Sequence, residues 1–208
     1  MNAPRGGQPC LAPRCTPTAI ISRHRWAHAL LRSFGWRSRL PEYPPVAKAV
    51  IIVYPHTSNW DFVWGMLVRL ACGWPVHWIG KHTLFRGPAG PLFRRVGGIP
   101  INRSVPGGFV DAVADEFRRR DTLLVAIAPE GTRKYAPYWK SGFYRIALAA
   151  GAPVLLAYID YAKREIGLCG QIILTGDSAA DMAKIAAAYA RKTAHVQANA
   201  SPVRLHPE

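Results

Sequence analysis

Residues 48–72 read KAVIIVYPHTSNWDFVWGMLVRLAC, which joins a short apolar run to a polar turn and then to a helical pattern. The apolar run at 48–54 is rich in β-branched side chains and predicts a strand that is buried on both faces. Apolar positions recur with helical spacing from 60 to 72, so a helix is expected there. A buried strand followed directly by a helix is the unit from which α/β domains are built.

The same alternation of apolar runs and helical patterns continues along the chain. Further strands are expected over residues 76–80, 99–101, 122–128, 154–159 and 171–174. Further helices are expected over residues 108–120, 141–150 and 179–193. Near-continuous Val, Ile and Leu runs between helices indicate an α/β fold, a single domain in which helices flank a mixed, mostly parallel sheet.

The length and composition fit one folded domain. A chain of 208 residues is long enough to bury a complete hydrophobic core. Half of the residues are hydrophobic and 19% are charged, which excludes wholesale disorder, collagen and a coiled coil. The longest uncharged run inside the domain is shorter than the roughly 20 residues of a membrane span, so no transmembrane helix is expected.

The core domain is expected to cover residues 41–200, with shorter segments on either side. Residues 1–22 are Pro-rich and acid-free, and we expect them to be disordered. Residues 23–40 are expected to form a basic amphipathic helix, suited either to a lipid interface or to capping the domain. Residues 201–208 are expected to be a tail. The hydrophobic side of the first helix would carry Trp26, Leu30, Leu31, Phe34 and Trp36.

The charge points to an anionic partner. The 27 Lys and Arg outnumber the 12 Asp and Glu, which gives a formal net charge of +15. Nucleic acid, acidic lipid head groups and phosphorylated substrates are all compatible with that charge. No helix-turn-helix, zinc module or RNA-binding signature is present, so nucleic acid is not expected to be the partner. The cysteines and histidines lack zinc-ligand spacing, so no metal site is expected.

The polar turn after the first strand carries the first pair of candidate site residues. In open α/β sheets, functional side chains favour the loops at the carboxyl ends of strands. Asn59 is predicted to cap the following helix, which leaves His56 in the loop and Asp61 in the first helical turn. Asp61 can then orient the imidazole of His56, which would act as a general base. For this pair alone, a structural histidine and an aspartate placed for the helix dipole remain the alternative.

Two later strand ends carry arginines. The segment GGIPINRS places Arg103 after one short strand, and APEGTR places Glu130 and Arg133 after another. A guanidinium group can bind two oxygens of a phosphate at once. Either arginine alone would be interpreted as a solvated side chain. Two arginines and a glutamate at strand ends, in a domain that also has the His56 loop, indicate a functional site.

The order of these segments resembles that of the glycerolipid acyltransferase family. HTSNWD has the His-x4-Asp spacing of the first family block, GGIPINR resembles the second block and PEGTR the third. YWKSGFYRIALAAGAPV is similar to the stretch that leads into the fourth block of 1-acylglycerol-3-phosphate acyltransferases. Four blocks in the family order are more specific than any one of them. The resemblance implies a glycerol-3-phosphate acyltransferase-like fold.

The resemblance implies a role for each matching residue. His56 would remove the proton from an acceptor hydroxyl while Asp61 orients it, and no covalent acyl-enzyme is expected. The acyl donor would be a thioester of coenzyme A or of acyl carrier protein, and it is a co-substrate, so no cofactor is implied. Arg103 and Arg133 would bind the acceptor phosphate. The full set of implied substrate-binding residues is Lys81, Arg103, Glu130, Gly131, Thr132 and Arg133.

The implied reaction moves a fatty acyl group to the free hydroxyl of a lysophospholipid, with 1-acylglycerol 3-phosphate giving phosphatidate. Another lyso-lipid acceptor, such as a lyso-ornithine lipid, would use the same chemistry. The third alternative is a non-enzymatic protein that binds an anionic membrane or nucleic acid. A cytoplasmic protein bound peripherally to the inner face of an anionic membrane is expected. It would attach through residues 26–36, through its net positive charge and through Trp60, Trp64, Trp74 and Trp78, with some of these tryptophans belonging to the core instead.

Overall fold

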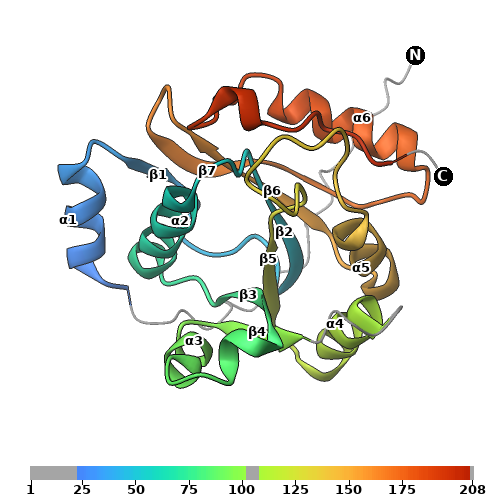
Figure 1. Cartoon of the computed structure of the whole chain (residues 1–208), viewed down its shortest axis with the longest axis horizontal. Coiled ribbons are helices and arrows are strands. Elements are labelled where there is room, and N and C mark those ends of the chain that lie inside the picture. The colour runs from blue at the N-terminus through green and yellow to red at the C-terminus, as the bar shows by residue number, and fades with distance from the viewer. Residues whose placement is uncertain (1–22, 102–107, 207–208) are drawn as a thin grey trace, which may run out of the picture.

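The structure is a computed structural model that describes residues 23–101 and 108–206. The disorder expected for residues 1–22 and the site role expected for Arg103 therefore lie outside the described residues. Figure 1 shows a central sheet with helices packed on both of its faces.

Seven strands form one sheet in the order β1-β7-β6-β2-β5-β3-β4. The neighbouring strands from β6 to β4 are all parallel, whereas β7 is antiparallel to β6 and β1 is parallel to β7. The predicted mixed, mostly parallel sheet is therefore confirmed. The strands are β1 (Arg37–Arg39), β2 (Lys48–Tyr54), β3 (Val76–Lys81), β4 (Gly98–Ile101), β5 (Leu123–Ile127), β6 (Val154–Asp160) and β7 (Glu165–Ile172).

The helices cover the two faces of the sheet in separate groups. In Figure 1, α1 and α2 lie on one side of the sheet, and α4, α5 and α6 lie on the other. The α-helices are α1 (Arg25–Ser33), α2 (Asn59–Cys72), α3 (Gly90–Arg95), α4 (Gly108–Arg119), α5 (Gly142–Ala150) and α6 (Ser178–Tyr189). The 3-10 helices are η1 (His82–Phe85) and η2 (Gln197–Asn199).

Successive side chains of the central strand β2 point to opposite faces of the sheet, and the core therefore has two parts. Val50 and Ile52 are fully buried and belong to the cluster formed with α4, α5 and α6. Ala49 and Ile51 point to the opposite face, where they pack with Trp74, which follows α2. Because β2 is buried on both faces, it reads as a continuous apolar run in the sequence.

The N-terminal segment differs from the helix expected over residues 23–40. α1 ends at Ser33, Gly35 has a φ of 76°, and residues Arg37–Arg39 pair with β7 as an edge strand. The five hydrophobic residues do not share one side of a helix. Leu31 and Trp36 are buried, whereas Trp26 and Phe34 are each 55% exposed. The segment therefore both caps the domain and leaves aromatic side chains in solvent.

Other parts of the chain also differ from the sequence prediction. The last strand covers Glu165–Ile172 rather than residues 171–174, because its Gly-rich sequence hides the strand pattern. η1 and α3 are short elements that the sequence analysis did not predict. The expected tail is packed against the domain as far as it is described, since Leu205 forms a β-bridge with Trp139.

Candidate active site

The candidate site residues gather at one edge of the sheet because three neighbouring parallel strands end there. β2 lies between β5 and β6 in the sheet, and all three run in the same direction. The loop after β2 carries His56, the loop after β5 carries Glu130 to Arg133, and Tyr161 follows β6 directly. This edge is where ligand sites of open α/β sheets are found.

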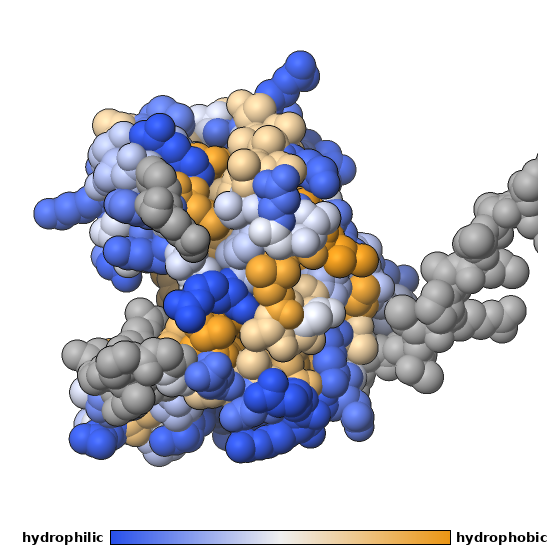
Figure 2. Space-filling model, turned by 90° about the vertical axis from the view of Figure 1, so that its right-hand side faces the viewer, coloured by the Kyte–Doolittle hydropathy of each residue, from blue (hydrophilic) through white to orange (hydrophobic). Residues whose placement is uncertain are grey.

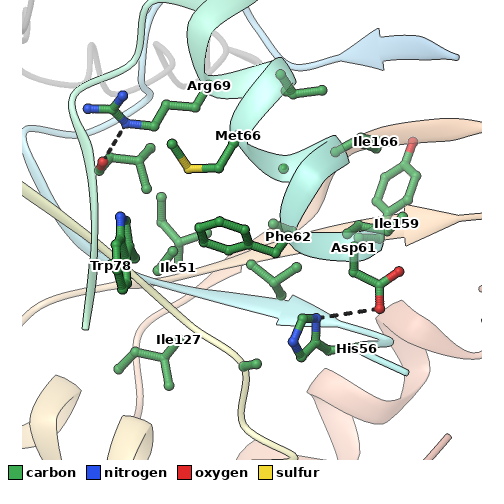
Figure 3. A pocket seen from close by; sticks show the side chains of 18 of the residues that line it. Ile51, His56, Asp61, Phe62, Met66, Arg69, Trp78, Ile127, Ile159 and Ile166 are labelled. Atoms are coloured by element: carbon green, nitrogen blue, oxygen red, sulfur yellow. Dashed lines mark hydrogen bonds and ion pairs between the residues drawn. The ribbon is translucent and has the colours of Figure 1, made fainter. Parts of the chain in front are cut away.

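His56 and Asp61 form the centre of the site (Figure 3). His56 Nδ1 lies 3.4 Å from Asp61 Oδ2. The side chain of His56 is 19% exposed and that of Asp61 is 1% exposed, so the carboxylate is buried behind the imidazole. The structure thus brings together the two residues that their spacing in the sequence predicted to form a pair. With Nδ1 facing the carboxylate, Nε2 is left to accept a proton.

The turn between the two residues also starts helix α2. Asp61 Oδ2 accepts hydrogen bonds from the backbone N–H groups of Thr57 at 2.7 Å and Ser58 at 2.8 Å. The Ser58 side chain accepts in return from the Asp61 backbone N–H, which completes a capping box, and it also accepts from the Trp60 N–H at 3.2 Å. The prediction that Asn59 caps this helix is therefore wrong. Ser58 has the extended backbone of an N-cap, and Asn59 is the first helical residue.

Tyr161 also contacts Asp61, although the sequence analysis did not select it. Its hydroxyl donates a hydrogen bond of 2.6 Å to Asp61 Oδ1. Tyr161 lies 100 positions from Asp61 along the chain. The available signal was its place directly after a buried strand, but a single tyrosine in that position is not specific.

Glu130 supports the backbone of the site. Its side chain is almost completely buried, at 1% exposure. Oε2 accepts from the His56 N–H at 2.6 Å, and Oε1 accepts from the Ser201 N–H at 2.9 Å. Burial raises the pKa of Glu130, and these two N–H donors oppose that rise. Glu130 therefore joins the His56 turn to the C-terminal segment rather than facing open space.

Gly131, Thr132 and Arg133 line the same cavity as His56 and Asp61. Gly131 has a φ of 68°, and a Cβ there would lie 2.9 Å from Lys140 Cγ, so this sharp turn requires glycine. Thr132 Oγ1 accepts from the Lys134 N–H at 3.2 Å, and Arg133 is exposed.

For the other two predicted phosphate-binding residues, the structure gives only a backbone position or no position. Lys81 is the last residue of β3, which pairs with β5, so its backbone lies at the same edge of the sheet. Arg103 belongs to the undescribed residues 102–107.

The electrostatic surroundings favour a neutral His56. Burial lowers the pKa of the imidazole, the Asp61 carboxylate raises it, and the Arg133 guanidinium lowers it, with a net decrease. A histidine whose pKa lies below its usual value of about 6.5 is mostly deprotonated at neutral pH. His56 can therefore accept a proton at neutral pH.

A cavity of about 550 Å³ runs from this polar edge beneath helix α2. In Figure 3, Phe62, Met66 and Arg69 follow one another along α2 away from His56. Arg69 lies at the far end of the view, where its Nε donates to the Val76 carbonyl at 2.7 Å. Most of the wall is apolar. Its apolar side chains include Ile51, Val53, Phe62, Met66, Val68, Trp78, Ile79, Ile127, Ile159, Ile166 and Leu168.

The arrangement can hold a long apolar chain with its reactive end beside a base. Within residues 23–101 and 108–206, no group of three or more His, Cys, Asp or Glu side chains is placed to bind a metal ion. None of the helices in that part of the chain has the length and apolarity that crossing a bilayer requires.

Comparison with known proteins agrees with this fold. The crystal structure of the 1-acyl-sn-glycerophosphate (LPA) acyltransferase PlsC from Thermotoga maritima is similar, with a TM-score of 0.52 and 16% sequence identity. The similarity covers 74% of this chain and 68% of that chain. No curated protein matches the sequence. The model of the Acyltransferase family matches residues 36–160, which include His56, Asp61 and the segment from Glu130 to Arg133. The chain therefore belongs to the Acyltransferase family.

Proposed function

We propose that the protein transfers a fatty acyl group from acyl-CoA or acyl carrier protein to the hydroxyl of a lysophospholipid, chiefly 1-acylglycerol 3-phosphate. The observation that carries this proposal is the pairing of His56 with Asp61 at the polar end of a long apolar cavity. Arg133 on the rim adds a cation for the acceptor phosphate.

The proposed reaction is direct transfer between the two substrates. His56 Nε2 takes the proton from the acceptor hydroxyl while Nδ1–H faces the Asp61 carboxylate. The hydroxyl oxygen forms a bond to the thioester carbonyl carbon, which gives a tetrahedral oxyanion. The carbon–sulfur bond then breaks, and the leaving thiolate receives the proton from the His56 imidazolium. The products are the new ester and the free thiol, and His56 is returned to its neutral form.

The cavity beneath α2 is the proposed site of the acyl chain of the donor. Its wall is mostly hydrophobic, and His56 and Asp61 lie at its polar end. Burying an alkyl chain contributes about 0.8 kcal/mol per CH2 group. A donor held in this way would present its carbonyl carbon beside His56, where the acceptor hydroxyl is activated.

A thiol-release assay with a panel of acceptors tests the reaction and the acceptor together. Purified protein would be mixed with palmitoyl-CoA and, in separate reactions, with lysophosphatidate, lysophosphatidylcholine or a lyso-ornithine lipid. Thiol release that depends on lysophosphatidate supports the proposal. Equal rates with the lyso-ornithine lipid would exclude the preference for a phosphate monoester. Repeating the assay with palmitoyl-acyl carrier protein identifies the preferred donor.

Filling the cavity at Gly65 is expected to shorten the preferred acyl chain. Gly65 lines the cavity from α2, and a Cβ added there meets no atom within 4 Å. Gly65→Leu would therefore occupy free space, and leucine favours a helix more than glycine does. We expect kcat/KM for palmitoyl-CoA to fall at least about tenfold, with that for hexanoyl-CoA unchanged.

Gly65→Ala is the matched control for this substitution, because it adds a single methyl group at the same position. It is expected to keep a chain preference close to that of the wild type. If Gly65→Leu has the wild-type preference across donors from hexanoyl-CoA to stearoyl-CoA, the donor chain does not lie beneath α2.

Peripheral binding to an anionic membrane is part of the same proposal. Trp26, Phe34 and Trp60 are each 55% exposed, whereas Trp64 and Trp74, which were also expected at the membrane, are buried in the core. Phe34 and Trp60 both contact the Trp64 ring, at centroid distances of 5.5 and 5.9 Å, so α1 and the start of α2 form one aromatic surface. Exposed aromatic rings beside arginines suit the head-group region of a bilayer, and the net charge of +15 favours anionic lipid.

Removing two of these rings is expected to weaken membrane binding. The double variant Trp26→Ala, Phe34→Ala should lower the partition coefficient onto phosphatidylglycerol vesicles by at least about tenfold, since each ring loses apolar contact. Vesicle sedimentation measures this effect. Because both side chains are largely exposed, the variant should keep its fold.

The matched control removes hydrophobic side chains elsewhere. Figure 2 shows the face of the molecule that carries α4 and α5, where hydrophobic side chains are mixed with hydrophilic ones. Leu148 on α5 and Ile173 after β7 are 42% and 74% exposed. Leu148→Ala, Ile173→Ala should bind vesicles as the wild type does. Equal binding by the aromatic double variant would show that another surface meets the membrane.

A further inference from the structure

The carboxylate of Asp61 has a second oxygen that the His-x4-Asp spacing does not explain. Oδ2 faces His56 Nδ1 and two backbone N–H groups. Oδ1 points the other way and accepts the hydroxyl of Tyr161 at 2.6 Å, the shortest of these contacts. The part of the chain that matches the Acyltransferase family ends at residue 160, so Tyr161 lies just outside it.

Tyr161 is itself held from three directions. Its backbone N–H donates to the Thr193 carbonyl at 3.0 Å. Its ring meets the edge of Trp36 at a centroid distance of 5.0 Å and that of His195 at 4.7 Å. These contacts leave the hydroxyl little freedom to move away from Asp61.

We infer that Tyr161 is a positioning residue, which fixes the carboxylate plane of Asp61 so that Oδ2 stays directed at His56 Nδ1. This inference rests on the proposed role of His56 as the base. The distance of 3.4 Å between Oδ2 and Nδ1 is already longer than an ordinary hydrogen bond. A small rotation of the carboxylate would therefore weaken the support that Asp61 gives to the imidazolium.

The hydroxyl of Tyr161 stays a donor throughout the working pH range. Burial and the hydrogen bond to Asp61 raise the pKa of Tyr161 well above its usual value. Among the residues that the structure describes, the charged groups that shift the pKa of His56 are Asp61 from α2 and Arg133 from the loop after β5. The Glu130 carboxylate holds the His56 backbone, and His195 packs on the Tyr161 ring.

Tyr161→Phe tests this role because it removes one oxygen atom and keeps the ring contacts. We expect kcat to fall about tenfold, which is a part of the roughly 10²–10⁴-fold that general base catalysis contributes, with KM for acyl-CoA unchanged. The pKa of His56 should also fall, because Asp61 raises it and would be held less well. In the pH profile of kcat/KM, the limb that reports His56 should therefore move to lower pH.

A second measurement does not depend on activity. Titration of 15N-labelled histidines by NMR reports the protonation of His56 directly, with His56→Ala to assign the signal. A lower pKa of His56 in Tyr161→Phe supports the inference, and an unchanged or higher value overturns it. If the wild type transfers no acyl group, the proposed function fails, whereas a wild-type kcat in Tyr161→Phe overturns only this inference.

Tyr189→Phe is the matched control. Tyr189 belongs to the core cluster formed with α4, α5 and α6, and its hydroxyl donates to the backbone carbonyls of Ile52 and Ala157. Its removal should lower the melting temperature while the pKa of His56 and kcat stay at their wild-type values. A shift of the His56 titration in Tyr161→Phe but not in Tyr189→Phe separates positioning from general stability.

Discussion

His56→Ala is expected to lower kcat for acyl transfer by about 10³-fold, because it removes the group proposed to take the proton from the acceptor hydroxyl. An unactivated hydroxyl is a poor nucleophile toward a thioester, whereas the apolar cavity and Arg133 remain in the variant. The KM for acyl-CoA should therefore stay close to that of the wild type. Thiol release with palmitoyl-CoA and lysophosphatidate measures both constants.

The pH dependence of the wild-type rate provides a second test of the role of His56. The rate should rise with pH as His56 loses its proton, and the midpoint should lie below the usual histidine value of about 6.5, since burial and Arg133 lower the pKa. The rate should be level by neutral pH. His56→Ala should lack this limb.

The control for the loss of an imidazole is His28→Ala on the exposed side of α1, which should keep the wild-type rate. Vesicle binding by His56→Ala should also be unchanged, because its side chain lies in the site rather than on the aromatic surface. Wild-type activity in His56→Ala would remove the mechanism.

The elements that the sequence predicted correctly are those whose pattern of apolar side chains can be recognised within the element itself. β2 and α2 were expected close to their observed bounds, because one is a continuous apolar run and the other has helical spacing with a polar start. β1 has no such pattern, since its sequence is RSR. It is a strand because it pairs with β7, where Arg39 also forms an ion pair of 2.8 Å with Glu165. Pairing between strands that lie far apart in the sequence cannot be recognised from a short stretch of residues.

The same distinction separates the predicted and unpredicted parts of the site. His56 and Asp61 are five positions apart, so one turn joins them and the spacing was informative. The contacts that hold this pair come from Tyr161 and Glu130, which are 100 and 74 positions from their partners. Only the strand order, with β2 between β5 and β6, brings them together. The sequence predicted the two residues of the proposed catalytic pair, and the structure adds the contacts that orient them.

Asp61→Asn is expected to lower kcat by about 10³-fold with little change in KM. The Thr57 and Ser58 N–H groups and His56 Nδ1 all face Oδ2, and the asparagine amide oxygen can still accept there. The amide nitrogen would then face the Tyr161 oxygen, which can accept a hydrogen bond. The fold should therefore survive, but the negative charge that stabilises the imidazolium is lost. In the serine protease triad, the equivalent change costs about 10⁴ in kcat.

The pH profile and a double variant distinguish this charge effect from a packing defect. Asp61 raises the pKa of His56, so Asp61→Asn should move the His56 limb to lower pH, whereas Asp111→Asn on the exposed side of α4 should leave it in place. Groups that act as one unit have strongly non-additive effects on rate. The variant with both His56→Ala and Asp61→Asn should therefore be no slower than His56→Ala alone. A further loss of about 10³-fold in the double variant would mean that Asp61 acts on the reaction independently of the imidazole.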